Sequence, residues 1–222
     1  MSKTIVIIPA RGGSKRLPNK NVMQFGEIPL LAHSILYAQK NPAIVDEIYV
    51  STDNASIKEV ALRYGAKVID RPETLSDDHE PTISALKHVL ESIETAVETV
   101  ILLQPTNPLR PDNLLKEAYE YYENNNCDSL FTVTRNHQKL GRIDHQTFIP
   151  YNYELGQRSQ DLEPLYYENG LLYITKAKAI LEHKIITENA FPFEVNHIFA
   201  TVDIDTQADL DYAAYLFKNH NS

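Results

Sequence analysis

Seven short apolar runs, separated by stretches with helical periodicity, constrain the fold of this chain more than any other feature. They cover residues 4–8, 47–51, 66–69, 98–104, 129–134, 167–175 and 197–203. Several are apolar along almost their whole length, which is typical of strands buried on both faces of a parallel sheet. The alternation of these strands with helices predicts an α/β fold with a doubly wound, mostly parallel sheet.

Three of the predicted helices have recognisable N-terminal signals. Pro81 begins one periodic stretch and Pro111-Asp112 begins another, at positions where a helix tolerates proline. Thr206 precedes a third and is followed three residues later by Asp209, a loose capping pattern. These signals predict helices after residues 81, 111 and 206.

Residues 135–165 interrupt the alternation. The segment is polar, carries scattered aromatic residues and has no clean period. We expect an excursion from the sheet, such as a hairpin or arm used in dimer contact, inserted into a single domain that spans residues 1–222. A long surface loop is the alternative, although loops of this length in compact domains are usually functional.

Composition excludes several functions. A net charge of -9 argues against general nucleic-acid binding, which requires a broad basic surface. No apolar run is long enough for a membrane span, and the N-terminal apolar run is too short for a signal peptide. The single Cys127 excludes an internal disulfide and a cysteine-rich zinc site, so we expect a cytoplasmic protein.

The polar residues that are suited to binding or catalysis follow the predicted strands. Ligands of open α/β sheets bind beyond the carboxyl ends of the strands, so the segments that follow them should share one site. These segments are residues 9–15, 51–53, 104–110 and 203–205.

The loop after the first strand, "PARGGSK", gathers positive charge in an acidic protein. Arg11, Lys15, Arg16 and Lys20 occur within ten residues, and no acidic residue appears before Glu27. Glycines allow backbone N–H groups to approach an oxyanion closely. The loop therefore predicts a phosphate site, although it matches neither common phosphate-loop motif and a turn with solvated cations remains the alternative. The predicted nucleotide-binding residues of the loop are Ala10, Arg11, Gly12, Gly13, Ser14 and Lys15.

Asp203 and Asp205 form a candidate metal site. Two carboxylates two residues apart in an extended segment point the same way, and oxygen ligands favour Mg²⁺ (or Mn²⁺) with substrate phosphates. A purely structural role for Asp205 and Thr206, capping the last helix, is the alternative. Phosphates on one side and a divalent metal on the other are the equipment of phosphoryl or nucleotidyl transfer.

The sequence resembles the acylneuraminate cytidylyltransferases, also called CMP-sialic acid synthetases, over nearly its whole length. The resemblance implies a Rossmann-like nucleotidyltransferase fold and an enzyme that joins CTP to a 3-deoxy-nonulosonic acid, releasing pyrophosphate. It also implies a homodimer in which an arm closes the partner's sugar pocket. The matching segments are "IPARGGSKRLPNKN" at 8–21 and those at 51–54, 71–78, 102–110, 158–174 and 202–210.

The same resemblance implies roles for individual residues. Lys20 and Arg11 would hold the triphosphate and stabilise charge as pyrophosphate leaves. Asp205, a metal ligand with Asp203, is the first choice if a protein base is needed. The residues implied to contact cytidine are Asn21, Arg71 and Thr82. The residues implied to face the sugar are Gln104, Arg158 (acting in trans), Asn169 and Tyr173.

Some of these motifs also occur in other classes of protein. Metal-dependent glycosyltransferases also use an Asp-x-Asp pair on an α/β sheet, and enzymes for the eight-carbon acid Kdo have a similar first loop. An inactive nucleotide-binding protein would lack a phosphate or metal residue, but Arg11, Lys20, Asp203 and Asp205 are all present. The identity of the nonulosonic acid is not encoded in these motifs.

Overall fold

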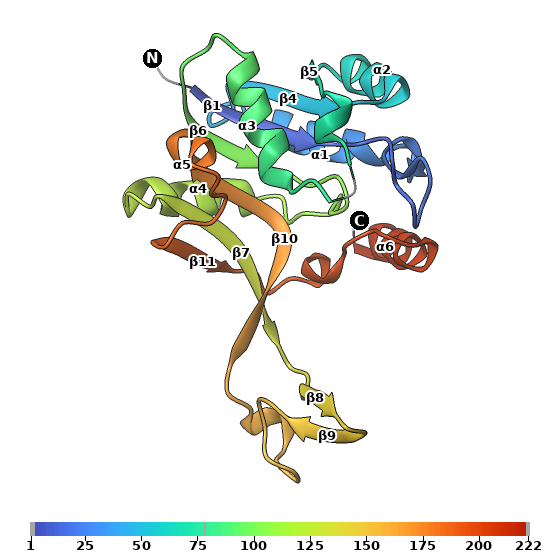
Figure 1. Cartoon of the computed structure of the whole chain (residues 1–222), viewed down its shortest axis with the longest axis vertical. Coiled ribbons are helices and arrows are strands. Elements are labelled where there is room, and N and C mark those ends of the chain that lie inside the picture. The colour runs from blue at the N-terminus through green and yellow to red at the C-terminus, as the bar shows by residue number, and fades with distance from the viewer. Residues whose placement is uncertain (1–2, 78, 221–222) are drawn as a thin grey trace.

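A seven-stranded sheet forms the centre of the computed structural model, which describes residues 3–77 and 79–220 (Figure 1). Asp78, the last residue of the motif at 71–78, therefore lies outside the described residues. The strand order is β11-β7-β10-β6-β1-β4-β5. The strands are β1 (Lys3–Pro9), β4 (Glu47–Thr52), β5 (Lys67–Asp70), β6 (Val97–Leu102), β7 (Ser129–Asn136), β10 (Leu165–Lys176) and β11 (Ala190–Glu194).

The sheet is mostly parallel, as predicted. β10 is antiparallel to both of its neighbours, β6 and β7, while every other pairing is parallel. The N-terminal part of β10 therefore lies at the sheet edge where the other strands end. Asn169 and Gly170, in the middle of β10, thus lie against Asn107 and Gln104 in the segment that follows β6.

Helices cover both faces of the sheet, which confirms the doubly wound arrangement. Val6 and Ile8 of β1 pack on the face covered by α1, α2 and α4, and Ile5 and Ile7 pack on the face covered by α3 and α5. This division follows from the alternation of side chains along a strand. The helices are α1 (Leu30–Gln39), α2 (Ala55–Arg63), α3 (Thr82–Ser92), α4 (Leu114–Asn124) and α5 (Ala177–Leu181).

The last helix, α6 (Gln207–His220), packs on the segment after β1 rather than on the sheet. Its buried Leu210 and Leu216 share a cluster with Leu17 and Phe25, the latter in the small hairpin of β2 (Gln24–Phe25) and β3 (Ile28–Pro29). This packing brings residues 203–205 beside the basic loop.

Thr206 and Asp209 cap α6 reciprocally, as predicted. The Thr206 N–H donates to Asp209 Oδ2 at 2.7 Å, and the Asp209 N–H donates to Thr206 Oγ1 at 3.3 Å. Each side chain thus satisfies a backbone donor at the helix start.

The predicted strand at 197–203 is wrong. Residues Ile198–Thr201 form a 3₁₀ helix, and the apolar residues Phe199 and Val202 are buried in the cluster with α6. The seventh strand is instead β11, which contains Pro192 and pairs with β7. A proline cannot donate to a ladder, so it is tolerated here because β11 is an edge strand.

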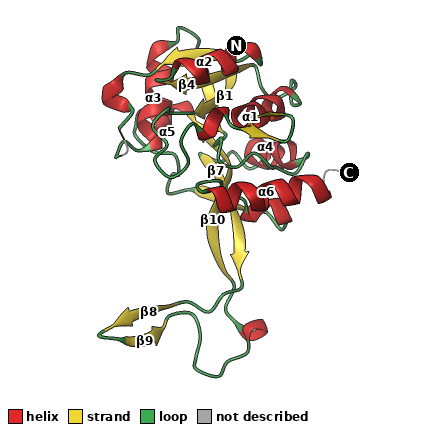
Figure 2. Cartoon of the chain, turned by 90° about the vertical axis from the view of Figure 1, so that its right-hand side faces the viewer, coloured by secondary structure: helices red, strands yellow, loops and turns green. Residues whose placement is uncertain are grey.

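The segment between β7 and β10 forms an arm that projects from the sheet (Figures 1 and 2). We use the term arm for residues 137–164. β7 and β10 pair up to Asn136 and Leu165, and the arm carries a hairpin of β8 (Gly141–Asp144) and β9 (Thr147–Pro150). Its use in dimer contact stays a prediction. Among the described residues, no helix has the length and apolar character that a membrane span needs.

Candidate active site

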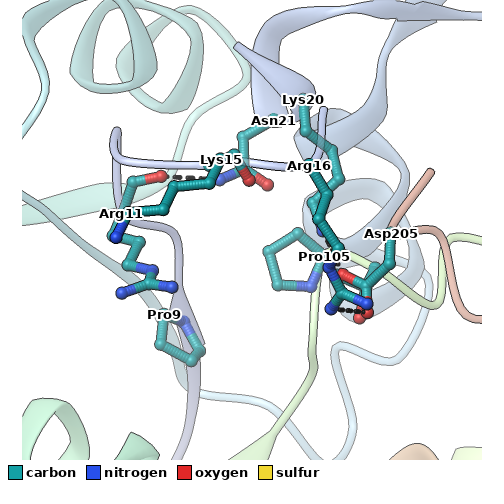
Figure 3. A pocket seen from close by; sticks show the side chains of 10 residues that line it. Pro9, Arg11, Lys15, Arg16, Lys20, Asn21, Pro105 and Asp205 are labelled. Carbon is teal, nitrogen blue, oxygen red and sulfur yellow. Dashed lines mark hydrogen bonds and ion pairs between the residues drawn. The ribbon is translucent and has the colours of Figure 1, made fainter. Parts of the chain in front are cut away.

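A cavity of about 450 Å³ opens where the chain order of the sheet reverses. β1 has β4 on one side and β6 on the other, and the cavity lies between the segments that follow β1 and β6 (Figure 3). Crevices at such switch points are the usual ligand sites of open α/β sheets. The lining residues are Pro9, Arg11, Ser14, Lys15, Arg16, Lys20, Asn21, Pro105, Thr106 and Asp205.

Backbone contacts hold the basic loop in place. The Ala10 N–H donates to the Ser51 carbonyl at 2.9 Å, and the Gly12 N–H donates to Asp53 Oδ1 at 2.8 Å. The buried Asn21 donates from Nδ2 to the Arg11 carbonyl at 3.0 Å. The end of β4 and the 3₁₀ helix Lys20–Val22 thus fix the two ends of the loop.

The two glycines of the loop have different surroundings. A Cβ on Gly12 would lie 2.8 Å from Asn54 Nδ2 and 2.9 Å from Asn54 Cβ, whereas a Cβ on Gly13 would meet nothing within 4 Å. Asn54 caps α2, because its Oδ1 accepts the N–H groups of Ser56 and Ile57. The cavity lining includes neither glycine, nor Ala10, so their role in nucleotide binding stays a prediction.

Two cations of the cavity converge on Asp205 (Figure 3). The buried Lys20 donates from Nζ to Asp205 Oδ1 at 2.9 Å and to the Ile204 carbonyl at 2.7 Å. Arg16 donates from Nη2 to Asp205 Oδ2 at 2.5 Å. Arg11 and Lys15 line the opposite side of the cavity in the same view. Arg16 is one of the four cations of the predicted phosphate loop, and its sequence position left open whether it binds phosphate or faces solvent.

Asp203 lies beside this cavity without lining it. Burial of its carboxyl against the surrounding protein raises the pKa of Asp203, a hydrogen bond with Thr106 opposes the shift, and the Asp205 charge adds to it. Two carboxylates that repel one another fit a shared hard cation such as Mg²⁺. Among the described residues, no group of three His, Cys, Asp or Glu side chains could hold an ion, so water or substrate phosphate oxygens would complete the site.

The predicted sugar residues Asn169 and Tyr173 lie in the middle and later part of β10, and Gln104, which follows β6, lies near Gly170 of the same strand. Gln104 Oε1 would lie 3.3 Å from a Cβ on Gly170, whose φ of +75° favours glycine. The buried Asn169 accepts from Thr132 Oγ1 at 2.5 Å. Asn169 and Tyr173 thus already make internal hydrogen bonds.

Tyr173 is tied to a carboxylate on its own strand. Its hydroxyl donates to Glu168 Oε1 at 2.5 Å. Burial raises the pKa of the Tyr173 phenol, and the hydrogen bond to Glu168 raises it further. The phenol therefore stays protonated and serves as a donor.

Arg110 holds the backbone of Gln104 in place, a role that the sequence did not indicate. Its guanidinium is buried and donates to the Leu171 carbonyl at 2.7 Å, the Gln104 carbonyl at 2.8 Å and Ser34 Oγ at 3.0 Å. Burial lowers the pKa of Arg110 to about 10. Its position at the end of "QPTNPLR" gave no signal of burial, because arginine is rarely found inside proteins.

Three predicted residues lie apart from the cavity lining. Arg71 donates from Nη2 to the Ser51 carbonyl at 2.7 Å, and burial lowers its pKa. Thr82 is the first residue of α3. Arg158 lies on the arm and pairs with Asp161 at 2.8 Å, so within one chain it does not join the cavity. Contacts of these residues with substrate stay predictions.

A basic cavity at the switch point of a mostly parallel sheet, with two adjacent carboxylates, fits the class of phosphoryl- and nucleotidyltransferases. Residues 5–221 match the family model described as Cytidylyltransferase. This chain therefore belongs to the cytidylyltransferase family, which confirms the family expected from the sequence motifs.

Two of three relatives match this chain over nearly the full length of both proteins, and the third is a longer protein. A pseudaminic acid cytidylyltransferase from Campylobacter jejuni subsp. jejuni serotype O:23/36 (strain 81-176) is 38% identical over 230 residues, 99% of each chain. A CMP-N,N'-diacetyllegionaminic acid synthase from Legionella pneumophila is 34% identical over 93% of each chain. An N-acylneuraminate cytidylyltransferase from Streptococcus agalactiae is 34% identical over 93% of this chain, which spans 51% of that protein.

Solved structures share the fold. A CMP:2-keto-3-deoxy-manno-octonic acid synthetase complexed with CTP superposes with a TM-score of 0.75 at 20% identity, covering 98% of this chain and 99% of the other. A 4-diphosphocytidyl-2C-methyl-D-erythritol synthase gives a TM-score of 0.72 at 14% identity, with the same coverage of both chains. These similarities confirm the predicted fold class.

Proposed function

We propose that this protein transfers CMP from CTP to the anomeric hydroxyl of a nonulosonic acid and releases pyrophosphate. The observation that carries the proposal is the single cavity that gathers Arg11, Lys15, Lys20 and Asp205 at the switch point of the sheet. The names of the most similar relatives, which act on pseudaminic, legionaminic and neuraminic acids, support the class of acceptor.

The cavity suits the triphosphate, and the neighbouring part of β10 around Asn169 and Tyr173 suits the sugar acid. Lys20 and Arg11 would neutralise the phosphates as the anomeric oxygen attacks the α-phosphorus in line and the bond to pyrophosphate breaks. Gln104 lies between these two regions, because it follows β6 and contacts the region of Gly170. Positioning of the two substrates and charge neutralisation would supply most of the rate enhancement.

Asp203 and Asp205 would hold a magnesium ion (or manganese) together with substrate phosphate oxygens. The ion would supply further neutralisation of the phosphate charge. The buried Lys20 keeps one oxygen of Asp205 fixed, so this carboxylate is preorganised beside the phosphate cavity. Such an arrangement makes Asp205 a better ligand than a proton acceptor.

A pseudaminic-type acid is our first candidate acceptor. Two relatives of that name are 38% and 36% identical over 99% of this chain and 99% of their own length. A third, fused to a hydrolase in Helicobacter pylori, is 30% identical over 87% of this chain. The legionaminate and neuraminate enzymes reach 34–35% over 93% of this chain.

The arm would act between two copies of the chain. It exposes the apolar side chains of Ile143, Phe148 and Leu155, which favours a partner surface. A homodimer would bury them and could bring Arg158, whose planar fork suits a carboxylate, to the sugar acid in the partner. We further propose that the protein uses CTP in the cytoplasm. The CMP-sugar would then serve as the donor in the synthesis of cell-surface polysaccharides.

The test is an assay of purified protein with CTP, Mg²⁺ and a panel of pseudaminic, legionaminic, N-acetylneuraminic and deaminated neuraminic acids. We expect pyrophosphate release and a CMP-sugar, fastest with pseudaminic acid. Absence of pyrophosphate with every acid would refute the proposal. UTP in place of CTP should give little product.

A matched pair of variants ties the activity to the cavity. Asp205→Asn should lower kcat/KM by at least about 100-fold, because it removes a metal ligand and the partner of Lys20. Asp211→Asn makes the same change on α6, where Asp211 accepts from Gln207, and should stay within about twofold of the parent. Equal losses in both variants would contradict the assigned site.

A further inference from the structure

Asp205 has two cationic partners of very different character. The Lys20 side chain is 8% exposed and approaches Oδ1 at 2.9 Å. The Arg16 side chain is 68% exposed and approaches Oδ2 at 2.5 Å. Lys20 is also fixed by the Ile204 carbonyl, whereas the arginine reaches Asp205 from the rim of the cavity (Figure 3).

A divalent cation on Asp205 would compete with these two partners, because its charge repels the nearby guanidinium and ammonium groups. Arg16 occupies Oδ2, the oxygen that Lys20 leaves open. Exposed arginine–carboxylate pairs contribute little net stability, so this contact can be exchanged at small cost. The buried Lys20 pair is harder to break, because the ammonium would lose its partner in a poorly solvated position.

An incoming triphosphate offers Arg16 a replacement partner. Arg16 lines the same cavity as Arg11 and Lys15, and a guanidinium binds phosphate through paired, charge-assisted hydrogen bonds. The exchange conserves the number of charge pairs, since Asp205 gains a divalent cation as the arginine gains phosphate oxygens.

We propose that Arg16 is an exchangeable cation: it holds Asp205 in the nucleotide-free protein and moves to the triphosphate when nucleotide and metal bind. This inference rests on the proposed function, because it takes CTP as the ligand of the cavity. It assigns Arg16 as a triphosphate-binding residue and distinguishes it from Lys20, which keeps Asp205 in both states.

If the exchange occurs, loss of Arg16 should change the affinities for the divalent cation and for CTP in opposite directions. Removing Arg16 frees Oδ2 and lowers the local positive charge, so a divalent cation should bind the nucleotide-free protein more tightly. The same removal takes away a phosphate ligand, so CTP should bind more weakly. A residue that merely faces solvent would change neither affinity, and a purely structural one would weaken both.

The experiment compares Arg16→Gln with Arg63→Gln. Arg63 is a matched control, because its side chain is 63% exposed and pairs with Glu59 at 2.7 Å on α2. Binding of Mn²⁺ to the nucleotide-free protein is measured by electron paramagnetic resonance, and binding of CTP with Mg²⁺ by calorimetry without any sugar acid. Circular dichroism and thermal melting verify the fold of each variant.

For Arg16→Gln we expect Mn²⁺ affinity to rise about two- to fivefold and CTP affinity to fall about three- to tenfold. Arg63→Gln should change both by less than about 1.5-fold. Unchanged or weaker Mn²⁺ binding in Arg16→Gln, or unchanged CTP binding, would overturn the exchange. Failure of the parent protein to bind CTP would instead refute the proposed function, and the exchange with it.

Discussion

At the scale of single residues, Gly12 and Gly13 show how neighbours with the same side chain carry different constraints. Gly12 faces the side chain of Asn54, which cannot withdraw because it caps α2. Gly13 faces open space. The constraint on Gly12 is therefore steric, which is a stricter requirement than the phosphate access expected from the sequence.

Substituting each glycine by alanine separates these cases. Gly12→Ala should lower the free energy of unfolding by about 1–3 kcal/mol, because the new methyl would overlap Asn54. Gly13→Ala should change it by less than about 0.5 kcal/mol. Urea denaturation followed by circular dichroism measures both, and similar losses in the two variants would contradict the steric explanation.

Arg110 lends itself to a second residue-scale prediction. Arg110→Lys keeps the charge but cannot reach three acceptors on separate segments, so we expect a loss of at least about 2 kcal/mol in unfolding free energy. Arg142→Lys, on the exposed strand β8, should have almost no effect. An Arg110→Lys variant as stable as the parent in urea would show that one ammonium suffices.

The residue types of the site were predictable from the sequence, but their pairing was not. The cations behind β1 and the carboxylates at 203–205 stand out as polar residues after apolar runs. The contacts of Asp205 with Lys20 and Arg16 join residues 185 and 189 positions apart. They depend on the packing of α6 against the first loop, and no local pattern encodes that packing.

At the scale of elements, buried strands were predictable and the edge strand was not. β1, β4 and β6 are apolar because helices cover both of their faces. The stretch 190–194, "AFPFE", was not among the predicted strands; its proline weakens a strand pattern, yet an edge position accommodates it. The apolar residues near 198–204 predicted a strand because burial beneath a helix leaves a similar composition.

Glu47 joins the starts of three strands and yields a pH prediction. Its carboxylate accepts from Lys3 at 2.5 Å, from the Tyr49 hydroxyl and from Lys67 at 3.1 Å. The hydrogen bond from Lys3, followed by that from Tyr49, lowers the pKa of Glu47 to about 2 from 4.5. A lowered folded-state pKa stabilises the fold above the ordinary value and loses this contribution as pH falls toward about 2.

Glu47→Gln should therefore cost about 1 kcal/mol of unfolding free energy at pH 7, less than the full shift implies because solvent reaches the margin of the sheet. The difference from the parent should shrink between pH 5 and 2, a window set by the two pKa values. Glu59→Gln, an exposed control on α2, should show a small difference at every pH. If the difference in unfolding free energy between Glu47→Gln and the parent is the same at every pH, the link between the lowered pKa and stability is refuted.

At the scale of the whole molecule, the arm is an element without a partner in one chain. Ile143 and Leu155 are 79% and 80% exposed, which is unusual for large apolar side chains on one projection. The proposed homodimer would cover them, and the arm would then serve the active site of the second copy.

Charges on the arm test this assembly. The double variant Ile143→Asp and Leu155→Asp should become monomeric in light scattering and lose most turnover, while its melting temperature drops only by the dimer's contribution. Leu62→Asp, 55% exposed on α2, should leave the oligomeric state unchanged. A parent protein that is monomeric at assay concentration and fully active would rule out a role in trans.

The reversed direction of β10 has a consequence for how such enzymes diversify. Asn136 and Leu165 face each other in the β7–β10 ladder, so the chain leaves and re-enters the sheet at adjacent points. The arm therefore begins and ends at two residues that pair with each other in the sheet. Arms of different length or composition can be exchanged there without changing the strand order, and the basic loop, residues 203–205 and α6 stay in place. If the arm closes the partner's sugar pocket as proposed, changes within residues 137–164 would alter acceptor selectivity and leave the nucleotide cavity unchanged.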